Sequence, residues 1–348
     1  MATLKLSAAL RARIDGRASF SPRLLPRGST GAVRQTIPAE ASEFEVDPGY
    51  FVDFETDERA RKEDATRAER LAWVRPLDRL MSWTNMGPKL RLARQLVPHV
   101  RPPALDPHAI ERFAAKLKAG VAGQPSDSLG SSVTMRSIRQ TVLGALHTAF
   151  GDYPDEALAT FTVINRSWTL TPQTLDAASA AKIKARFRAD LNKIGITNMP
   201  GPFVAFLHGE FEPTSGSIVP HFHGTTTREK AEVLKRLKAK EGSRRFLGYV
   251  PTASGGAPVV CKPVRDRRKQ FSYLLKSYWP ARTIRWIGGK LKRDRQGRRI
   301  PEPFGSQVLL WLDRQRLRDL TIMNDCWSLR NGGTKAMKRL YLSVFGAW

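Results

Sequence analysis

The first 150 residues show the spacing of apolar residues that is typical of α-helices. Leu71, Val74 and Leu77 follow one another at intervals of three residues. Such intervals place apolar side chains on one face of a helix. The pattern predicts helices over residues 66–81, 107–121 and 137–150.

A pattern typical of β-strands begins after residue 158. Residues 159–167 are rich in Phe, Thr, Val and Ile, which are common in strands. In residues 203–212 apolar and polar positions alternate, so His208, Glu210 and Glu212 share one face of the predicted strand.

The rest of the pattern completes an alternation of strands and helices. Its order, β-α-β-β-α-β with one added strand and a trailing helix, predicts an α+β fold with a mainly antiparallel sheet, helices packed on it, and flanking helical regions. We expect a helix over 178–194, a turn at 213–216 and a hairpin strand over 217–225, a helix opened by a capping box from Thr226 to Glu229, strands over 245–250 and 257–264, a helix from near Gln270 and a basic amphipathic helix over 308–320.

Composition excludes some classes of protein. Of the 348 residues 41% are hydrophobic, so the chain can form a core and is not disordered throughout. Its apolar stretches are shorter than the roughly 20 residues that cross a bilayer, and no secretion signal opens it, so we expect a cytoplasmic protein without a membrane partner. Cys261 and Cys326 cannot form a disulfide framework.

The sequence divides into four regions. Residues 1–60 form a basic arm that we expect to be disordered, and residues 61–150 a small helical region without an assigned role. Residues 151–285 hold the predicted sheet, and residues 286–348 a basic loop and a C-terminal helical segment. The segment 123–132, rich in Gly, Pro and Ser, is the best linker candidate.

Net charge points to the class of partner. The chain has 58 Lys and Arg and 32 Asp and Glu, a formal charge of +26. Such an excess favours a polyanion, because Lys and Arg release counterions from the phosphates they neutralise. Nucleic acid is therefore the first expected partner.

Two histidines stand one residue apart on the second arm of the predicted hairpin. Because side chains alternate along a strand, His221 and His223 point to the same face, close enough to share a metal ion, unless they simply face solvent. The partner strand offers His208, Glu210 and Glu212 as further ligands. A mixed set of histidine and carboxylate suits Mn²⁺ or Mg²⁺ better than structural zinc.

A tyrosine and a lysine lie on the helix expected from near Gln270. Tyr273 and Lys276 are three residues apart, so the phenol and the ammonium would be neighbours on one helical surface. The lysine could then stabilise a phenolate or a phosphate oxygen. The alternative for Tyr273 is an ordinary packing residue. Tyr278 would point well away from Tyr273.

The order of these motifs resembles a known family. A Phe-Thr-Val-Ile strand at 161–164, Glu210-Phe211, Pro220-His221-Phe222-His223, a Pro-Val-x-Asp segment at 263–266 and Tyr273-x-x-Lys276 are similar to the catalytic domain of rolling-circle replication initiators of the His-hydrophobic-His endonuclease superfamily. The resemblance spans roughly residues 158–280. It implies the ferredoxin-like or RRM-like palm of these nicking domains.

The resemblance also implies roles for individual residues. His221 and His223 would be metal ligands and Glu210 the third, with Glu212 and His208 as alternatives, because the loop between Glu210 and His221 is longer than usual. Tyr273 would be the nucleophile and Lys276 its assistant.

The implied function is replication initiation on a plasmid or phage. The protein would nick and rejoin one DNA strand at a single-stranded or cruciform origin through a 5′-phosphotyrosine intermediate, with a host helicase and polymerase as further partners. A transposase or relaxase of the same superfamily is the alternative with the same chemistry. A non-enzymatic basic nucleic-acid-binding protein is the alternative from another class.

Positive charge is concentrated around the predicted nucleophile. Residues 261–300 contain fourteen Lys and Arg but only two Asp. The run could be a solvated surface, but mutual repulsion favours a polyanion nearby. The residues that we expect to bind DNA are Arg265, Arg267, Arg268, Lys269, Lys290, Lys292 and Arg293.

Overall fold

The computed structural model describes residues 56–74, 104–124, 126–238, 246–251, 256–276, 278–282, 284–287, 290–293 and 297–326. Nearly all of the basic arm predicted for residues 1–60 lies outside these residues, as do the end of the helix expected at 66–81 and residues 327–348.

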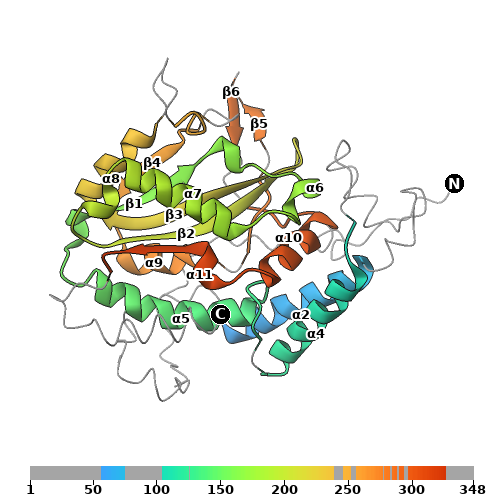
Figure 1. Ribbon diagram of the computed structural model, residues 1–348. Helices are drawn as coiled ribbons and strands as arrows, with labels where there is room; N and C mark the ends of the chain where they lie inside the picture. The colour runs from blue at the N-terminus through green and yellow to red at the C-terminus, as the bar shows by residue number, and fades with distance from the viewer. Residues whose placement is uncertain are drawn as a thin grey trace.

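A five-stranded antiparallel sheet forms the centre of the protein (Figure 1). Its strand order is β4-β1-β3-β2-β7, and each neighbouring pair is antiparallel. The α+β fold with a mainly antiparallel sheet is therefore confirmed. The strands are β1 (Leu158–Ile164), β2 (Phe203–Glu212), β3 (Ser217–Thr227), β4 (Val259–Pro263) and β7 (Thr321–Asn324).

Helices cover both faces of the sheet. Helix α7 (Ala180–Lys193) lies on one face, where its Phe187 stacks on Phe222 of β3 with ring centroids 4.5 Å apart. Helices α5 (Ser132–Ala149) and α9 (Arg267–Leu274) lie below the sheet in Figure 1. Because Phe222 faces α7, the two histidines that flank it face α9.

The remaining helices of the described chain are shorter or lie to one side. Helix α8 (Arg228–Leu234) lies over the β4 end of the sheet. Helices α2 (Asp57–Val74) and α4 (Pro107–Val121) pack together far from α8, at the lower right of Figure 1. Within the described residues, no helix is both long and apolar enough to cross a bilayer. The helices near the end of the described chain are α10 (Phe304–Asp313) and α11 (Leu317–Leu320), and α6 (Pro172–Leu175) precedes α7.

The core does not follow the domain boundaries expected at 150 and 286. Helix α5, which precedes residue 150, contributes to the same hydrophobic core as the sheet. Strand β7, which follows residue 286, is an edge strand of that sheet and pairs with β2. A second, smaller core lies between α2, α4 and α10 and includes Leu310. Regions 61–150 and 286–348 therefore pack together, because the apolar faces of α2 and α4 are covered by a helix from the end of the chain.

Several local predictions differ from the structure. The N-cap of α8 is Thr227, whose hydroxyl accepts a hydrogen bond from the Lys230 amide, and not Thr226. The described part of the strand expected at 245–250 is a turn, in which Phe246 has a positive φ of 58°. The helix expected at 308–320 is divided into α10 and α11.

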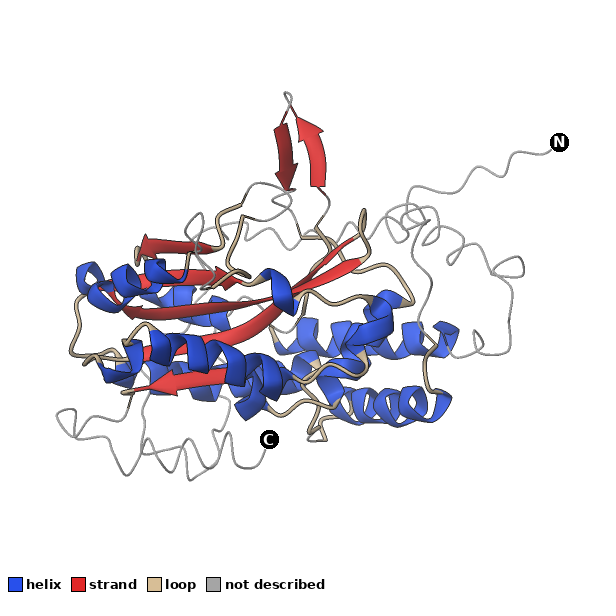
Figure 2. Cartoon of the chain, turned by 45° about the horizontal axis from the view of Figure 1, so that its top comes forward, coloured by secondary structure: helices blue, strands red, loops and turns tan. Residues whose placement is uncertain are grey.

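A two-stranded ribbon stands where a loop was expected. Strands β5 (Ile284–Ile287) and β6 (Lys290–Arg293) pair with each other in antiparallel register. Figure 2 shows this ribbon projecting from the body of the protein. It carries three of the positions expected to bind DNA, Lys290, Lys292 and Arg293.

Candidate metal centre

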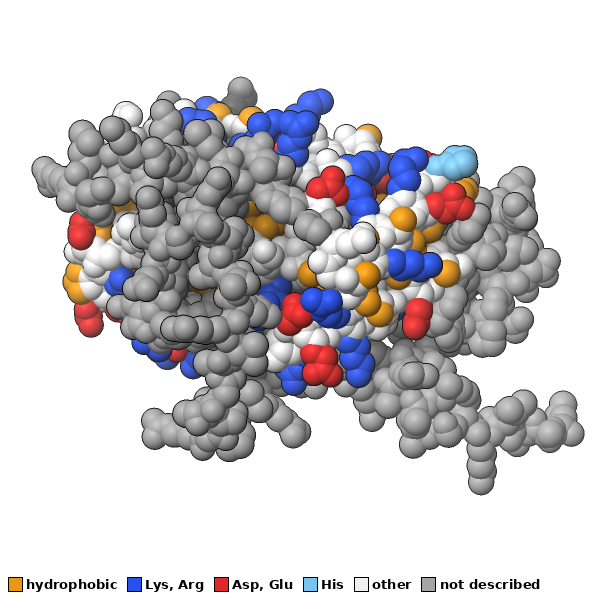
Figure 3. All heavy atoms as spheres, turned by 90° about the horizontal axis from the view of Figure 1, so that it is seen from below, with side chains coloured by type: hydrophobic (Ala, Val, Ile, Leu, Met, Phe, Trp, Pro, Cys, Tyr) orange, Lys and Arg blue, Asp and Glu red, His pale blue; other side chains and the backbone are white. Residues whose placement is uncertain are grey.

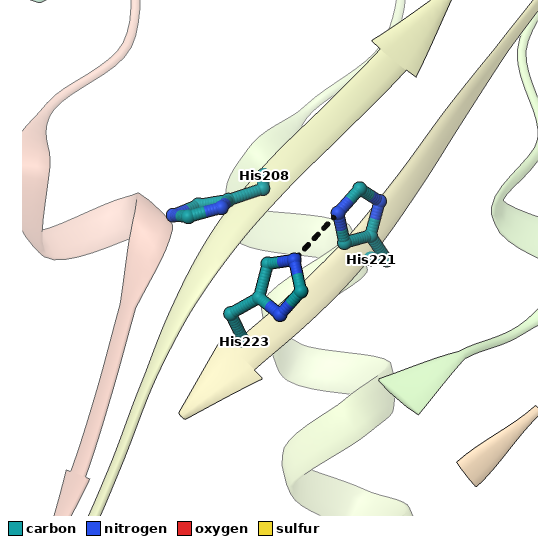
Figure 4. Close-up of side chains that lie close together, drawn as sticks. All are labelled: His208, His221 and His223. Atoms are coloured by element: carbon teal, nitrogen blue, oxygen red, sulfur yellow. Dashed lines mark hydrogen bonds between the residues drawn. The ribbon is translucent and has the colours of Figure 1, made fainter. Parts of the chain in front are cut away.

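Three histidines meet on the face of the sheet that α9 covers. In the register of β2 and β3, His208 lies opposite His221, and His223 follows two positions later on β3. One nitrogen from each ring lies within 4.8 Å of the other two, which is close enough to hold a metal ion. His208 is 7% exposed and His221 is 3% exposed. Figure 4 shows the three rings grouped over the two strands.

Each imidazole uses one nitrogen to contact an oxygen of the protein. His208 Nε2 lies 2.7 Å from the Leu274 carbonyl, and His221 Nδ1 lies 3.0 Å from the Val219 carbonyl. Because a carbonyl only accepts, these nitrogens must carry the protons, which leaves a lone pair on His208 Nδ1 and on His221 Nε2. Metal-binding histidines are held in this manner by outer oxygen atoms.

His223, the third imidazole, is held by the hydroxyl of Thr162. Its Nδ1 lies 2.8 Å from Thr162 Oγ1, and its Nε2 lies 3.1 Å from His221 Nε2. A threonine hydroxyl can accept from Nδ1–H or donate to a bare Nδ1, so it supports either tautomer of His223. Two nitrogens bound to one ion at about 2.0–2.1 Å are about 3.0–3.4 Å apart, so the spacing of the two Nε2 atoms suits a shared ion.

The surroundings keep the imidazoles of His208 and His223 neutral. Burial, together with the Lys276 ammonium and His221, holds the pKa of His208 well below its usual range. Burial and the neighbouring His221 and His208 do the same to the pKa of His223. A neutral imidazole is the form that binds metal, so His208 and His223 are in the metal-binding form at neutral pH.

Glu210, the expected third ligand, lies outside this cluster. Its carboxylate forms an ion pair with Arg282, with Oε1 2.9 Å from Nε. Glu212 accepts the amide hydrogens of Thr214 at 2.9 Å and Ser215 at 2.6 Å, and so stabilises the hairpin turn. Of the three alternatives on β2, the structure therefore places His208 beside the histidine pair, because it lies directly opposite His221.

Tyr273 and Lys276 lie beside the histidines. The Tyr273 ring centroid is 5.4 Å from that of His223 and 6.2 Å from that of His208. Lys276 Nζ lies 3.5 Å from the centroid of the Tyr273 ring. We expected Tyr273 and Lys276 on one helix, but α9 ends at Leu274. Lys276 therefore approaches the Tyr273 ring from the segment that follows the helix.

The environment changes the proton affinity of both groups. The protein packed around its hydroxyl raises the pKa of Tyr273 to about 12, although the nearby Arg282 opposes the rise. Burial, with Arg282 again nearby, lowers the pKa of Lys276 to about 7. Tyr273 is 39% exposed, so solvent and a substrate can still reach it.

The expected DNA-binding residues fall into two groups. Arg267 holds α9 to the segment after α5: it pairs with Asp155 at 2.7 Å and donates to the carbonyl oxygens of Phe150 and Tyr153. Its role is therefore structural. The other described side chains of the set, those of Arg265, Arg268 and Lys269, are exposed, and Lys269 pairs with Asp266 at 3.1 Å.

Charges on α2 and α4, in the lower part of the molecule in Figure 1, are mixed. On α2 and α4, Arg61 pairs with Asp57 at 2.7 Å and Lys116 pairs with Asp127 at 2.8 Å. Figure 3, a view from below, shows Lys and Arg interspersed with Asp and Glu over the described part of this face. Carboxylates therefore neutralise part of the positive charge of α2 and α4.

Sequence reasoning did not single out Arg282 or Thr162. The pairing of His208 with His221 could have been found from the sequence, because a hairpin that pairs Glu212 with Ser217 also pairs the residues four positions further from the turn on each strand.

Comparison of this chain with protein families, with curated proteins and with solved structures finds no match.

Proposed function

We propose that this protein nicks and rejoins one strand of DNA with the help of a divalent metal ion, and that it starts rolling-circle replication at an origin. The observation that carries the proposal is the convergence of His208, His221 and His223 with Tyr273. The strand order β4-β1-β3-β2, in a chain that runs β-α-β-β-α-β, adds support because it suits the ferredoxin-like palm of the initiator family.

The donor set fits a divalent ion. His208, His221 and His223 can each direct one lone pair inward while an oxygen atom holds the other nitrogen. Three imidazoles suit a borderline ion, whereas Mg²⁺ prefers oxygen ligands. Of the two ions first considered, Mn²⁺ is therefore the better fit. When bound, the ion would withdraw charge from a phosphodiester.

The proposed reaction exchanges one phosphate ester for another. The Tyr273 hydroxyl oxygen bonds to the scissile phosphorus, and the bond from phosphorus to the 3′ oxygen breaks. The proton lost by the phenol ends on the 3′ oxygen, which leaves as a hydroxyl. The 5′ phosphate stays on the tyrosine, so the reverse reaction rejoins the strand without another energy source.

Lys276 is the candidate for moving the proton. A phenol with a pKa of about 12 is a poor nucleophile at neutral pH. Because burial lowers the pKa of Lys276 to about 7, part of this amine is unprotonated under the same conditions. It can then take the phenol proton and return it to the leaving 3′ oxygen.

A covalent adduct tests the proposal. The protein is incubated with Mn²⁺ and a randomised single-stranded DNA library labelled at its 3′ end, since the fragment joined to tyrosine is the one on the 3′ side of the nick. We expect a labelled protein band that survives denaturation. Sequencing the captured DNA gives the cleavage site for further substrates.

Matched variants identify the nucleophile. Tyr273→Phe should abolish the adduct, whereas Tyr278→Phe, which leaves the proposed nucleophile in place, should retain it. Binding of the library without any adduct in the native protein would instead favour the non-enzymatic nucleic-acid binder.

A further inference from the structure

Glu210 holds an arginine next to the metal centre instead of binding the metal itself. We propose that Arg282 binds the scissile phosphate and that Glu210 is the positioning residue for its guanidinium. This inference rests on the proposed function and adds a substrate contact to it.

Arg282 is fixed against β2 by its backbone. The Phe211 amide donates to the Pro280 carbonyl, and the Arg282 amide donates to the Phe211 carbonyl, both at 2.9 Å. Trp279 packs on Gly209, where a Cβ would lie 2.2 Å from the indole ring. The two backbone hydrogen bonds to Phe211 and the packing of Trp279 on Gly209 therefore hold the segment that carries Arg282 against β2.

The register places Arg282 beside the reactive groups. Glu210 is two residues after His208 on β2, so both side chains lie on the face that α9 covers, about 7 Å apart along the strand. The 2.9 Å ion pair then brings the guanidinium to this face. Its charge acts on His223, Tyr273 and Lys276, so the guanidinium lies near the proposed nucleophile and a proposed metal ligand.

The ion pair between Glu210 and Arg282 suits phosphate binding, and it is not needed to hold residues 280–282 on β2. The backbone bonds to Phe211 already fix residues 280–282, so the fold does not need the pair for that purpose. A guanidinium has five N–H donors in a planar fork, so it can bond a carboxylate and a phosphate at the same time. The Arg282 side chain is 21% exposed, and a phosphodiester can therefore approach it.

The test compares substrates that differ only in charge at the cut. One oligonucleotide carries the cleavage site found by adduct capture, and a second carries a neutral methylphosphonate at the scissile position. With the normal phosphodiester, Arg282→Gln should slow adduct formation about 10²–10³-fold, the usual cost of removing one donor to a developing charge. Arg282→Lys should recover part of the rate.

The methylphosphonate separates contact with the phosphate from a structural effect. If Arg282 acts on the phosphate charge, native protein and Arg282→Gln should react with this substrate at the same rate. Glu210→Gln should slow adduct formation less than Arg282→Gln does, and only with the charged phosphodiester substrate. Arg236→Gln, which removes an exposed charge after α8, should match the native protein on both substrates.

The outcomes are distinct. Equal rates for native protein and Arg282→Gln on the phosphodiester would overturn the role of Arg282 and leave the proposed function standing. An equal loss on both substrates would also overturn it, because such a loss reflects structure. Absence of any adduct with native protein would remove the proposed function and this inference together. If Arg282→Gln melts early, Arg282→Lys provides the same comparison.

Discussion

His208 on β2 lies directly opposite His221 on β3, and this cross-strand pair brings a third imidazole to the His-x-His motif. Opposite positions of an antiparallel pair place side chains within about 4.5–5.5 Å at Cβ. Glu210, two residues further along, is directed to Arg282 instead. The three histidines are consequently the candidate ligand set, and no carboxylate among the described residues belongs to this group.

Metal affinity should distinguish His208 from Glu210. Loss of an outer-shell partner typically costs about 10–100-fold in metal affinity, and His208→Ala should cost more because it removes a ligand atom. Glu210→Ala should change the affinity for Mn²⁺ much less. Calorimetric titration of each purified variant with Mn²⁺ measures the difference. A larger loss for Glu210→Ala would show that the carboxylate is the ligand.

Thr162 should support the metal centre from behind. Its hydroxyl lies 2.8 Å from His223 Nδ1, so Thr162→Val removes the group that orients this imidazole. We expect Mn²⁺ affinity to fall about 10–100-fold. Thr160→Val is the matched control, because that hydroxyl is on the same strand but bonds to the Lys262 carbonyl. Equal affinities for the two variants would contradict the role of Thr162.

Adduct formation should depend on the protonation of Lys276. Its pKa is lowered to about 7, so the unprotonated amine increases as pH rises through 7. The rate constant at saturating Mn²⁺ should therefore rise about tenfold per pH unit below 7 and level off above it. Lys276→Gln should be slow and lose this inflection. An unchanged pH profile in that variant would assign the proton transfer to another group.

Asp64 should hold the helical region to the sheet domain. It is fully buried and accepts hydrogen bonds from Ser131 Oγ at 2.5 Å and from the Ser132 amide at 2.7 Å. Asp64→Ala leaves these donors unpaired and should lower the free energy of unfolding by about 2–4 kcal/mol. Asp127→Ala, which removes a carboxylate that is 71% exposed, should cost about 1 kcal/mol or less. Chemical denaturation measures both, and similar losses would refute the assignment.

The ribbon and α9 should respond differently to the removal of charge. Replacing Lys290 and Lys292 with Gln should weaken DNA binding and reduce the salt dependence of log K by about one unit for each phosphate that the protein no longer neutralises. Arg267→Gln should lower the melting temperature instead, because Arg267 pairs with Asp155. Binding isotherms at several salt concentrations test the first effect. An unchanged salt slope in the double variant would exclude these residues from the interface.

The hairpin could be predicted well because its signals are local. Alternating positions and a Gly-containing turn define β2 and β3, and their bounds differ from expectation only at the end of β3. The helix at Pro107–Val121 was likewise predicted in full, since its apolar residues keep one spacing, and the structure adds Asp106 as its N-cap.

Other features depend on contacts between distant parts of the chain. Arg282 reaches Glu210 only because residues 280–282 bond to β2 at Phe211. Strand β7 is four residues long, too short to show an alternating pattern, and it is a strand because it pairs with β2. Lys276 was expected on the helix of Tyr273, but α9 ends first and the chain turns back over the ring.

The most direct test is mass spectrometry of the peptide that contains Tyr273, after reaction with Mn²⁺ and single-stranded DNA and digestion of the bound DNA. The account predicts a nucleotide joined through its 5′ phosphate to Tyr273, and no such peptide when His208 or His221 is replaced by Ala. A nucleotide attached to another residue, or an unmodified Tyr273 in a reaction that nevertheless cuts DNA, would contradict it.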